Sequence, residues 1–370
     1  MTLHSSVNIP AGTKRTHNSY FPGDAEIERI LAERPGIRQQ GVGIVLGLVE
    51  GGRRRVFSHG HLSQDDAGTL DGDTLFELGS VTKVYTSLLL ADMVRRGEAA
   101  LDEPVQALLP AGVRVPKRNG RSITLHDLAT QTSGLPPVPE NFVVADSRNP
   151  YLSYSVDDLY RFLSTHELLH RIGVKFRYSD LNAGLLGHAL SCRAGLEYER
   201  LVRERILAPL GLDSTAIKLS EALAGRLALG HDAKWNVTPN WEFGPPFAGA
   251  GALRSTVHDQ LTFIEAMLGE RPSSLAAAIE DTLSIRRSRG DRDRRVGLGW
   301  GIDILDCDEM FVHGGETAGY SAIVTFLRKA AVGVVVLTNV KRKIADIAFH
   351  LINPDVRLSN GVTVERFPPK

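Results

Sequence analysis

Short β-rich runs of apolar residues lie near both ends of the chain, and patterns of helical period separate them. Residues 42–49 and 53–59 flank the turn Glu50-Gly51-Gly52, in which glycine supplies the positive φ angles of a tight hairpin. Similar runs, separated by turn residues, return late in the chain at residues 297–305, 309–313, 321–327 and 332–339. Together they predict strands that pair in one antiparallel sheet.

Helical periodicity covers most of the remaining chain. Residues 24–34 place three apolar side chains on one face behind Asp24, which we expect to cap the helix. Residues 80–98 have helical spacing, a cationic last turn and Gly97 as the expected stop. Further helical patterns occupy residues 125–131, 156–164, 181–193, 256–268 and 344–352.

The order of these elements predicts an α+β fold of the sandwich type. An antiparallel β-sheet is flanked by N- and C-terminal helices and carries an inserted all-helical lobe. We expect the sheet lobe at about residues 24–85 and 285–360, and the helical lobe at about 86–284. Because no linker, low-complexity block or repeat interrupts the sequence, residues 1–370 should form a single domain, with its ligand in the groove between the lobes.

Charge and composition exclude several classes of partner. The 43 basic and 43 acidic side chains give a formal net charge of zero, so the chain as a whole has no electrostatic attraction for nucleic acid or anionic lipid. The most apolar tract, residues 330–337, is far shorter than the roughly 20 residues that span a bilayer. Two isolated cysteines and the pair His59 and His61 make a poor metal set. We therefore expect no nucleic acid, no membrane and no metal.

The first 30 residues lack the pattern of a secretory signal, because nothing before Ile27 holds four apolar residues in a row. If the chain is complete, this predicts a cytoplasmic protein. If its start was removed, a periplasmic or secreted protein is the expectation. The sequence does not indicate an oligomeric state.

Ser80 and Lys83 lie where a strand or loop becomes a helix. Residues three apart on a helix share a face, so the Lys83 amine can reach the Ser80 hydroxyl. A serine hydroxyl is a weak nucleophile until a base takes its proton, and a lysine can be that base if desolvation lowers its pKa. The alternative is that Ser80 caps the helix and Lys83 is a surface residue.

Two further segments carry polar groups of the same kind. Tyr178-Ser179-Asp180 precedes a helix and offers a phenol and a carboxylate, although Asp180 could simply cap the helix while Tyr178 packs. The residues from His313 to Tyr320 (HGGETAGY) lie between two strands. Glycines there allow a substrate to approach the strand edge, and a backbone N–H can face an oxyanion, although a plain turn would need no function.

The segments SVTK, YSD and HGGETAGY, in this order, resemble the three motifs of serine β-lactamases and penicillin-binding proteins. The pattern is closest to the class C β-lactamase-like serine hydrolases, which include DD-carboxypeptidases, D-aminopeptidases, family VIII esterases and some acyltransferases. Supporting stretches that resemble this family are FELGSVTK, LDEPVQALLP, ITLHDLATQTSGLPP, FRYSDLNAGLLG and GAGALRSTVHDQLTF. The resemblance covers roughly residues 27–352.

The resemblance implies a role for each motif residue. Ser80 would be the acylated nucleophile, Lys83 its base or proton shuttle, and Tyr178 the second acid/base. The backbone N–H groups of Ser80 and Glu316 would form the oxyanion hole. No cofactor is implied.

Two departures from the family pattern concern substrate binding. Asp180 stands where Asn is usual, and an ionised carboxylate accepts hydrogen bonds but cannot donate them. His313, followed by Gly314 and Gly315, stands where most class C β-lactamases have the Lys of a K-T-G motif, which removes a permanent cation. Since His is partly charged near neutral pH, we expect weak binding of a β-lactam carboxylate that strengthens in acid.

The predicted function is that of a serine hydrolase which forms an acyl-enzyme on Ser80 and cleaves an amide or ester. A small-molecule ester, amide or peptide is the expected partner, with an esterase, a D-amino-acid peptidase or a β-lactamase-like enzyme as candidates. Two alternatives stay open. In an acyltransferase, an amine or alcohol would take the acyl group from the same acyl-enzyme. Alternatively, the protein could be a penicillin-binding sensor that does not turn over its substrate.

Overall fold

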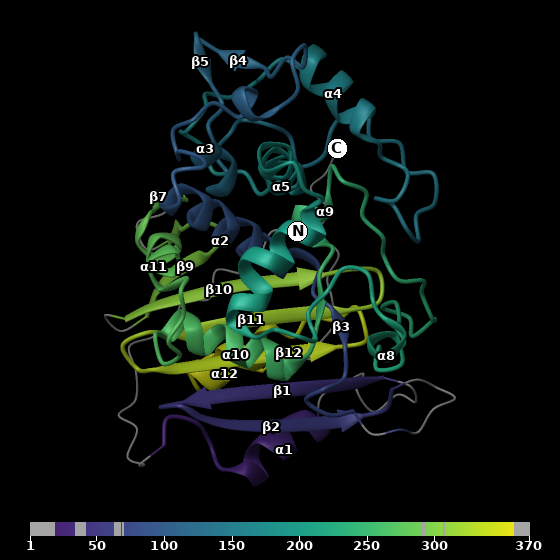
Figure 1. The fold of residues 1–370 in the computed structure, drawn as a ribbon. Coiled ribbons are helices and arrows are strands. Elements are labelled where there is room, and N and C mark those ends of the chain that lie inside the picture. The colour runs from purple at the N-terminus through teal and green to yellow at the C-terminus, as the bar shows by residue number, and fades with distance from the viewer. Residues whose placement is uncertain are drawn as a thin grey trace.

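The computed structural model describes residues 19–33, 42–62, 68, 70–289, 294–305 and 308–358. Within these residues, an eight-stranded antiparallel sheet has the order β2-β1-β12-β11-β10-β9-β8-β7 (Figure 1). Its strands are β1 (Gly43–Glu50), β2 (Arg53–Gly60), β7 (Arg287–Ser288), β8 (Arg294–Val296), β9 (Gly301–Leu305), β10 (Asp308–Glu316), β11 (Ser321–Leu327) and β12 (Val332–Thr338). Because β1 pairs with β12, the two ends of the chain share one sheet, which confirms the predicted fold class.

Helices cover both faces of this sheet. On one face, α1 (Asp24–Ala32) packs on β2, and α12 (Ala345–Ile352) packs on β11 and β12. On the other face, α10 (Val257–Leu268) packs on β1, β11 and β12. Side chains alternate between the two layers along each strand, so that Ile44 and Leu46 join one apolar core while Val45 joins the other.

A helical lobe lies above the sheet in Figure 1. Its centre is α5 (Asp180–Ala194), which is buried for most of its length and packs on α9, α3, α6 and η2. The elements of this part of the chain are η2 (Val105–Leu108), β4 (Lys117–Arg118), β5 (Arg121–Ser122), α3 (Leu125–Ala129), α4 (Val156–Thr165), α6 (Tyr198–Val202), η3 (Arg203–Leu207), α7 (Ala208–Leu210), α8 (Glu221–Ala224) and α9 (Ala248–Gly251).

The helix α2 (Thr82–Arg95) connects the sheet with the helical lobe and is buried along almost all of its length. It follows the short strand β3 (Phe76–Glu77) and the 3-10 turn η1 (Gly79–Val81), and β3 pairs with β6 (Arg254–Ser255). On the side of α2 away from α5 lies α11 (Ala276–Ser284), which packs against α2 and α10. The first turn of α2 therefore lies at the junction between the lobes.

Two expectations and one alternative reading need correction. The range 86–284, predicted for the helical lobe, includes α10, which packs on the sheet because its apolar face covers β1, β11 and β12. Asp24 does not cap α1, because the N-cap position is Gly23. Asp180 does not cap α5 either, since the Ser179 hydroxyl accepts the hydrogen bond from the Asn182 N–H. In the part of the chain that is described, no helix is both long and apolar enough to cross a membrane.

Candidate active site

Two glycines bring the third motif against the turn that carries Ser80. Gly79 has a φ of +50°, and a Cβ atom there would lie 2.8 Å from the Glu316 nitrogen. A Cβ atom on Gly315 would lie 1.9 Å from the Leu78 oxygen and 2.9 Å from the Ser80 nitrogen. Only residues without a side chain allow this approach. The backbone nitrogens of Ser80 and Glu316 are thereby held at one junction.

The end of β10 has a free edge at this junction. The pairing of β10 with β9 runs only from Asp308 to Val312, where Val312 lies opposite Gly301. On its other side, β10 stays paired with β11 as far as Glu316. In the described part of the chain, residues 314–316 thus have no strand on the β9 side, so an extended substrate could add there as a further strand.

Lys83 is the most constrained polar side chain of the site. It is only 2% exposed, and its Nζ donates to Ser80 Oγ, Asp180 Oδ1 and the Ala250 carbonyl, each at 2.8 Å. These three bonds use all the hydrogens of an ammonium group. Burial by itself would lower the pKa of Lys83, but the Asp180 carboxylate overcomes it and holds that pKa above the ordinary value. Desolvation therefore does not make Lys83 a resting base, contrary to the expectation from sequence.

Asp180 is the charge that holds Lys83. Burial favours the neutral acid, yet the ammonium of Lys83 and the hydrogen bonds from Lys83 and Tyr151 bring the pKa of Asp180 below its ordinary value. Its Oδ2 accepts a hydrogen bond from the Tyr151 hydroxyl at 2.9 Å. The sequence did not indicate Tyr151, because it belongs to no motif and lies 29 residues before Asp180.

Tyr178 lies between the nucleophile and the third motif. The Nζ of Lys83 is 5.0 Å from the centroid of its ring, and the ring of His313 is 6.3 Å away. Burial raises the pKa of the Tyr178 phenol, and the positive charge of Lys83 offsets only part of this effect. Tyr178 is therefore a neutral phenol beside a cation in the resting enzyme.

His313 is 8% exposed, and its Nδ1 is 2.9 Å from the Gly314 carbonyl oxygen. Because a carbonyl oxygen only accepts, Nδ1 carries the proton and Nε2 has the lone pair. Burial and the nearby charge of Lys83 lower the pKa of His313 to about 3. His313 is thus neutral near pH 7, where a partial charge was expected from sequence.

The side chain of Glu316 lies in an environment of its own, apart from the oxyanion hole that its backbone N–H was expected to form. Burial raises the pKa of its carboxyl to about 7, against the opposing charge of Lys341. Its Oε2 is buried and has no hydrogen-bond partner among the described residues. Since side chains alternate along a strand, the carboxyl of Glu316 lies on the opposite face of β10 from His313. Only the backbone of Glu316 lies at the Ser80 turn.

The structure thus brings together the side chains of Ser80, Lys83, Asp180 and Tyr178, with His313 beside them. They come from η1 and α2, from the start of α5 and the loop before it, and from β10, so the cluster lies where the sheet and the helical lobe meet. Among the described residues, no three His, Cys, Asp or Glu side chains are grouped to hold a metal ion. The arrangement offers a nucleophile, a fixed cation, a phenol and backbone N–H groups, which suits acyl transfer.

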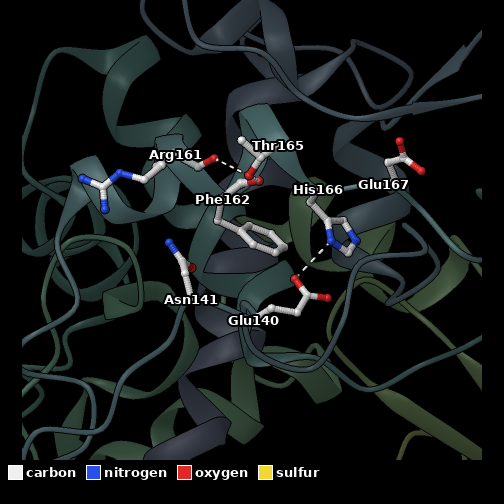
Figure 2. Close-up of a pocket in the computed structure, with 7 residues that line it drawn as sticks. All are labelled: Glu140, Asn141, Arg161, Phe162, Thr165, His166 and Glu167. Carbon is white, nitrogen blue, oxygen red and sulfur yellow. Dashed lines mark hydrogen bonds and ion pairs between the residues drawn. The ribbon is translucent and has the colours of Figure 1, made fainter.

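A cavity of about 390 Å³ lies elsewhere, at α4 on the helical lobe (Figure 2). It is lined by Glu140, Asn141, Arg161, Phe162, Thr165, His166 and Glu167. His166 Nδ1 lies 3.1 Å from Glu140 Oε2 there, a contact that Figure 2 shows as a dashed line. None of the residues of the Ser80 cluster lines this cavity, so its chemistry is separate from theirs.

Known proteins resemble this chain over most of its length. The family model described as Beta-lactamase matches residues 25–353. A beta-lactamase of Pseudomonas fluorescens is 25% identical over 344 residues, which is 82% of this chain and 90% of that protein. The D-alanyl-D-alanine-carboxypeptidase/endopeptidase AmpH of Escherichia coli (strain K12) is 32% identical over 185 residues, 50% of this chain and 48% of AmpH. The match therefore spans about half the length of AmpH.

Solved structures agree with these sequence matches. The class C beta-lactamase from Rhodobacter sphaeroides superposes with a TM-score of 0.71 at 27% identity, over 85% of this chain and 93% of that one. A beta-lactamase/D-alanine carboxypeptidase from Yersinia pestis, at 23% identity and a TM-score of 0.72 over 86% of this chain and 94% of that one, shows the same fold. Because the family model covers most of the sequence, this chain belongs to the beta-lactamase family of serine hydrolases.

Proposed function

We propose that this enzyme cleaves the amide or ester bond of a small-molecule or peptide substrate through an acyl-enzyme on Ser80. The observation that carries the proposal is the position of Lys83 Nζ, 2.8 Å from both Ser80 Oγ and Asp180 Oδ1 and close to the Tyr178 ring. A side chain that served only the fold would not bring a buried ammonium to a serine hydroxyl at a helix start, because burying a charge is costly.

In the proposed reaction, Ser80 Oγ attacks the substrate carbonyl carbon while its proton is relayed through Lys83 and the Tyr178 hydroxyl towards the leaving atom. Lys83 takes up the Ser80 proton as it releases one of its own, so it stays an ammonium and keeps its ion pair with Asp180. The backbone N–H groups of Ser80 and Glu316 stabilise the oxyanion. The C–N or C–O bond then breaks as Tyr178 and Lys83 return a proton to the leaving group. Water attacks the Ser80 ester, which releases the acid and restores the hydroxyl.

The chemistry of the third motif favours neutral substrates over β-lactams. A neutral His313 offers no cation for the carboxylate of a penicillin. We therefore propose small esters or D-amino-acid derivatives as better substrates than β-lactams. The resemblance to AmpH, whose name describes a D-alanyl-D-alanine-carboxypeptidase/endopeptidase, supports a peptide of D-amino acids as one candidate.

A substrate panel tests this proposal. The purified protein is assayed with p-nitrophenyl esters, D-amino-acid amides and nitrocefin, with and without an added amine, and is labelled with a fluorophosphonate. Ester or amide turnover and labelling, both lost in Ser80→Ala, are expected. The fold should survive, because a hydroxyl at a helix start contributes only ~1 kcal/mol. Activity retained by Ser80→Ala would overturn the assignment of the nucleophile, labelling without turnover would favour a sensor, and acyl transfer to the amine would favour an acyltransferase.

A further inference from the structure

Tyr151 reaches the Ser80 cluster from a segment that no motif includes. Its hydroxyl donates to Asp180 Oδ2 at 2.9 Å, while the other oxygen of that carboxylate accepts from Lys83 at 2.8 Å. Lys83 in turn donates to Ser80 at 2.8 Å. A chain of three hydrogen bonds therefore runs from Tyr151 through Asp180 and Lys83 to the nucleophile.

The ring of Tyr151 is fixed by other aromatic rings. It stacks on Phe243, with centroids 4.9 Å apart and an angle of 19° between the planes. Trp241 packs against it edge-on at 5.3 Å, and Phe247 and Phe142 have centroids at 5.0 and 5.4 Å. Such contacts restrict the ring to one orientation. The hydroxyl is consequently held at Asp180 by packing from its own loop, which carries Phe142, and from the distant segment 241–247 before α9.

Asp180 needs such a partner because it stands where the related motif has an amide. A carboxylate has two equivalent oxygens and can rotate, so Lys83 alone does not fix which oxygen faces it. The charged and titratable groups around this carboxylate are Lys83 from α2, Tyr178 from the preceding loop and Tyr151, with His313 of β10 farther away. Of these, Tyr151 is the one that occupies Oδ2.

We propose that Tyr151 is a positioning residue, which holds Asp180 ionised and aimed at Lys83 so that Lys83 stays directed at Ser80. This inference rests on the proposed acyl-enzyme function. The hydroxyl of Tyr151 touches neither the substrate carbonyl nor Ser80 in this role, and it acts only through Asp180. Its removal should alter the protonation of the cluster and leave the fold unchanged.

The chain contains a matched control for this role. Tyr154 belongs to the same aromatic cluster, with Phe142 and Phe247 as shared neighbours, but its hydroxyl donates to Asn141 Oδ1 at 2.9 Å. Tyr154→Phe therefore removes a buried hydroxyl of the same cluster without touching Asp180. Any effect of Tyr151→Phe that Tyr154→Phe shares is a packing effect.

The first experiment compares the pH profiles of Tyr151→Phe, Tyr154→Phe and the parent protein with a p-nitrophenyl ester. Loss of a hydrogen bond to a charged group should lower kcat about tenfold in Tyr151→Phe, with KM almost unchanged. The acid limb should move to higher pH by about one unit, because a carboxylate that loses a donor is protonated more easily. Tyr154→Phe should keep the profile of the parent. Equal profiles for all three proteins would overturn the inference.

The second experiment does not depend on turnover. In the Ser80→Ala background, the titration of the Asp180 carboxyl is followed by ¹³C NMR, with Asp180→Asn to assign the signal. Tyr151→Phe should raise the midpoint, and Tyr154→Phe should leave it in place. An unchanged midpoint in Tyr151→Phe would overturn the inference even if kcat falls. If ester turnover instead survives in Ser80→Ala itself, it is the proposed function that fails.

Discussion

The ionisable groups at the two ends of the site differ in whether they keep their charge. At the start of α2 and α5, Lys83 is buried, Asp180 is half-buried and both are charged, since each is the hydrogen-bonded partner of the other. At the end of β10, His313 is buried and Glu316 is half-buried, and no opposite charge among the described residues is in contact with either. Burial there makes His313 neutral and raises the pKa of Glu316 to about 7.

The difference shows that burial alone does not decide charge. Desolvation favours the neutral form of every ionisable group, and a charge persists only where an opposite charge and enough hydrogen bonds reach it. The nucleophile end of the site therefore keeps a fixed ion pair, while the third motif presents a neutral His313 and backbone N–H donors. A reaction in which charge appears on the substrate oxygen suits this division.

The largest loss of activity is expected when groups at the charged end of the site are removed. Lys83→Ala and Tyr178→Phe should each lower kcat/KM by about 10²-fold or more, the usual contribution of a group that moves the reacting proton. Because both act on one proton, the double variant should be about as slow as the slower single variant. Steady-state rates with one ester measure all three proteins. Losses that multiply would mean that the two groups act independently.

A slightly smaller loss of activity should follow when β10 is moved away from the Ser80 turn. In Gly315→Ala the new methyl group meets the Leu78 carbonyl oxygen, so β10 must move away from the Ser80 turn. Displacing one oxyanion donor should lower kcat about 10²-fold. Gly23→Ala is the control, because that glycine has a φ of −66° and nothing lies within 4 Å of an added Cβ. Full activity in Gly315→Ala would show that this contact does not position the oxyanion hole.

The elements of the fold were predictable where the signal is local. The bounds of β11 coincide with the predicted residues 321–327, and α10 begins directly after Thr256, whose hydroxyl caps it. A short β-rich run with turn residues at both ends indicates a strand without reference to the rest of the chain. The face that a helix buries is not local, which is why α10 was placed in the wrong lobe.

The motif residues of the site were also predictable, but their charges were not. Spacing placed Ser80 and Lys83 on one helical face, and their side chains are in contact. The charge state of Lys83 depends on Asp180, which lies 97 residues later in the sequence. Tyr151 shows the same limit, because its hydrogen bond to Asp180 requires the packing of the aromatic cluster.

A lysine in place of His313 would put a cation at the third motif, as Lys83 does at the other end of the site. His313→Lys should lower KM for an ester that carries a carboxylate, or for nitrocefin, by up to about tenfold, and leave a neutral ester unchanged. In the parent protein, KM for the anionic ester should not improve between pH 8 and pH 5.5, because His313 with a pKa of about 3 stays neutral. This replaces the expectation from sequence of tighter binding in acid. A clear improvement over that range would mean that His313 does gain a proton there.

The smallest expected effect concerns the stability of the neutral end. The pKa of Glu316 is about 7 in the folded protein against an ordinary value of 4.5, so the folded state binds the proton more tightly than the unfolded one. The resulting stability is fully present below pH 4.5 and is lost as the pH rises through 7. Glu316→Gln keeps the backbone N–H but cannot ionise. The melting temperature of the variant relative to the parent should therefore rise by roughly 4 °C between pH 4.5 and pH 8. Calorimetry of both proteins across this range isolates Glu316, since every other group titrates in both. A difference that is constant with pH would show that folding does not raise the pKa of Glu316.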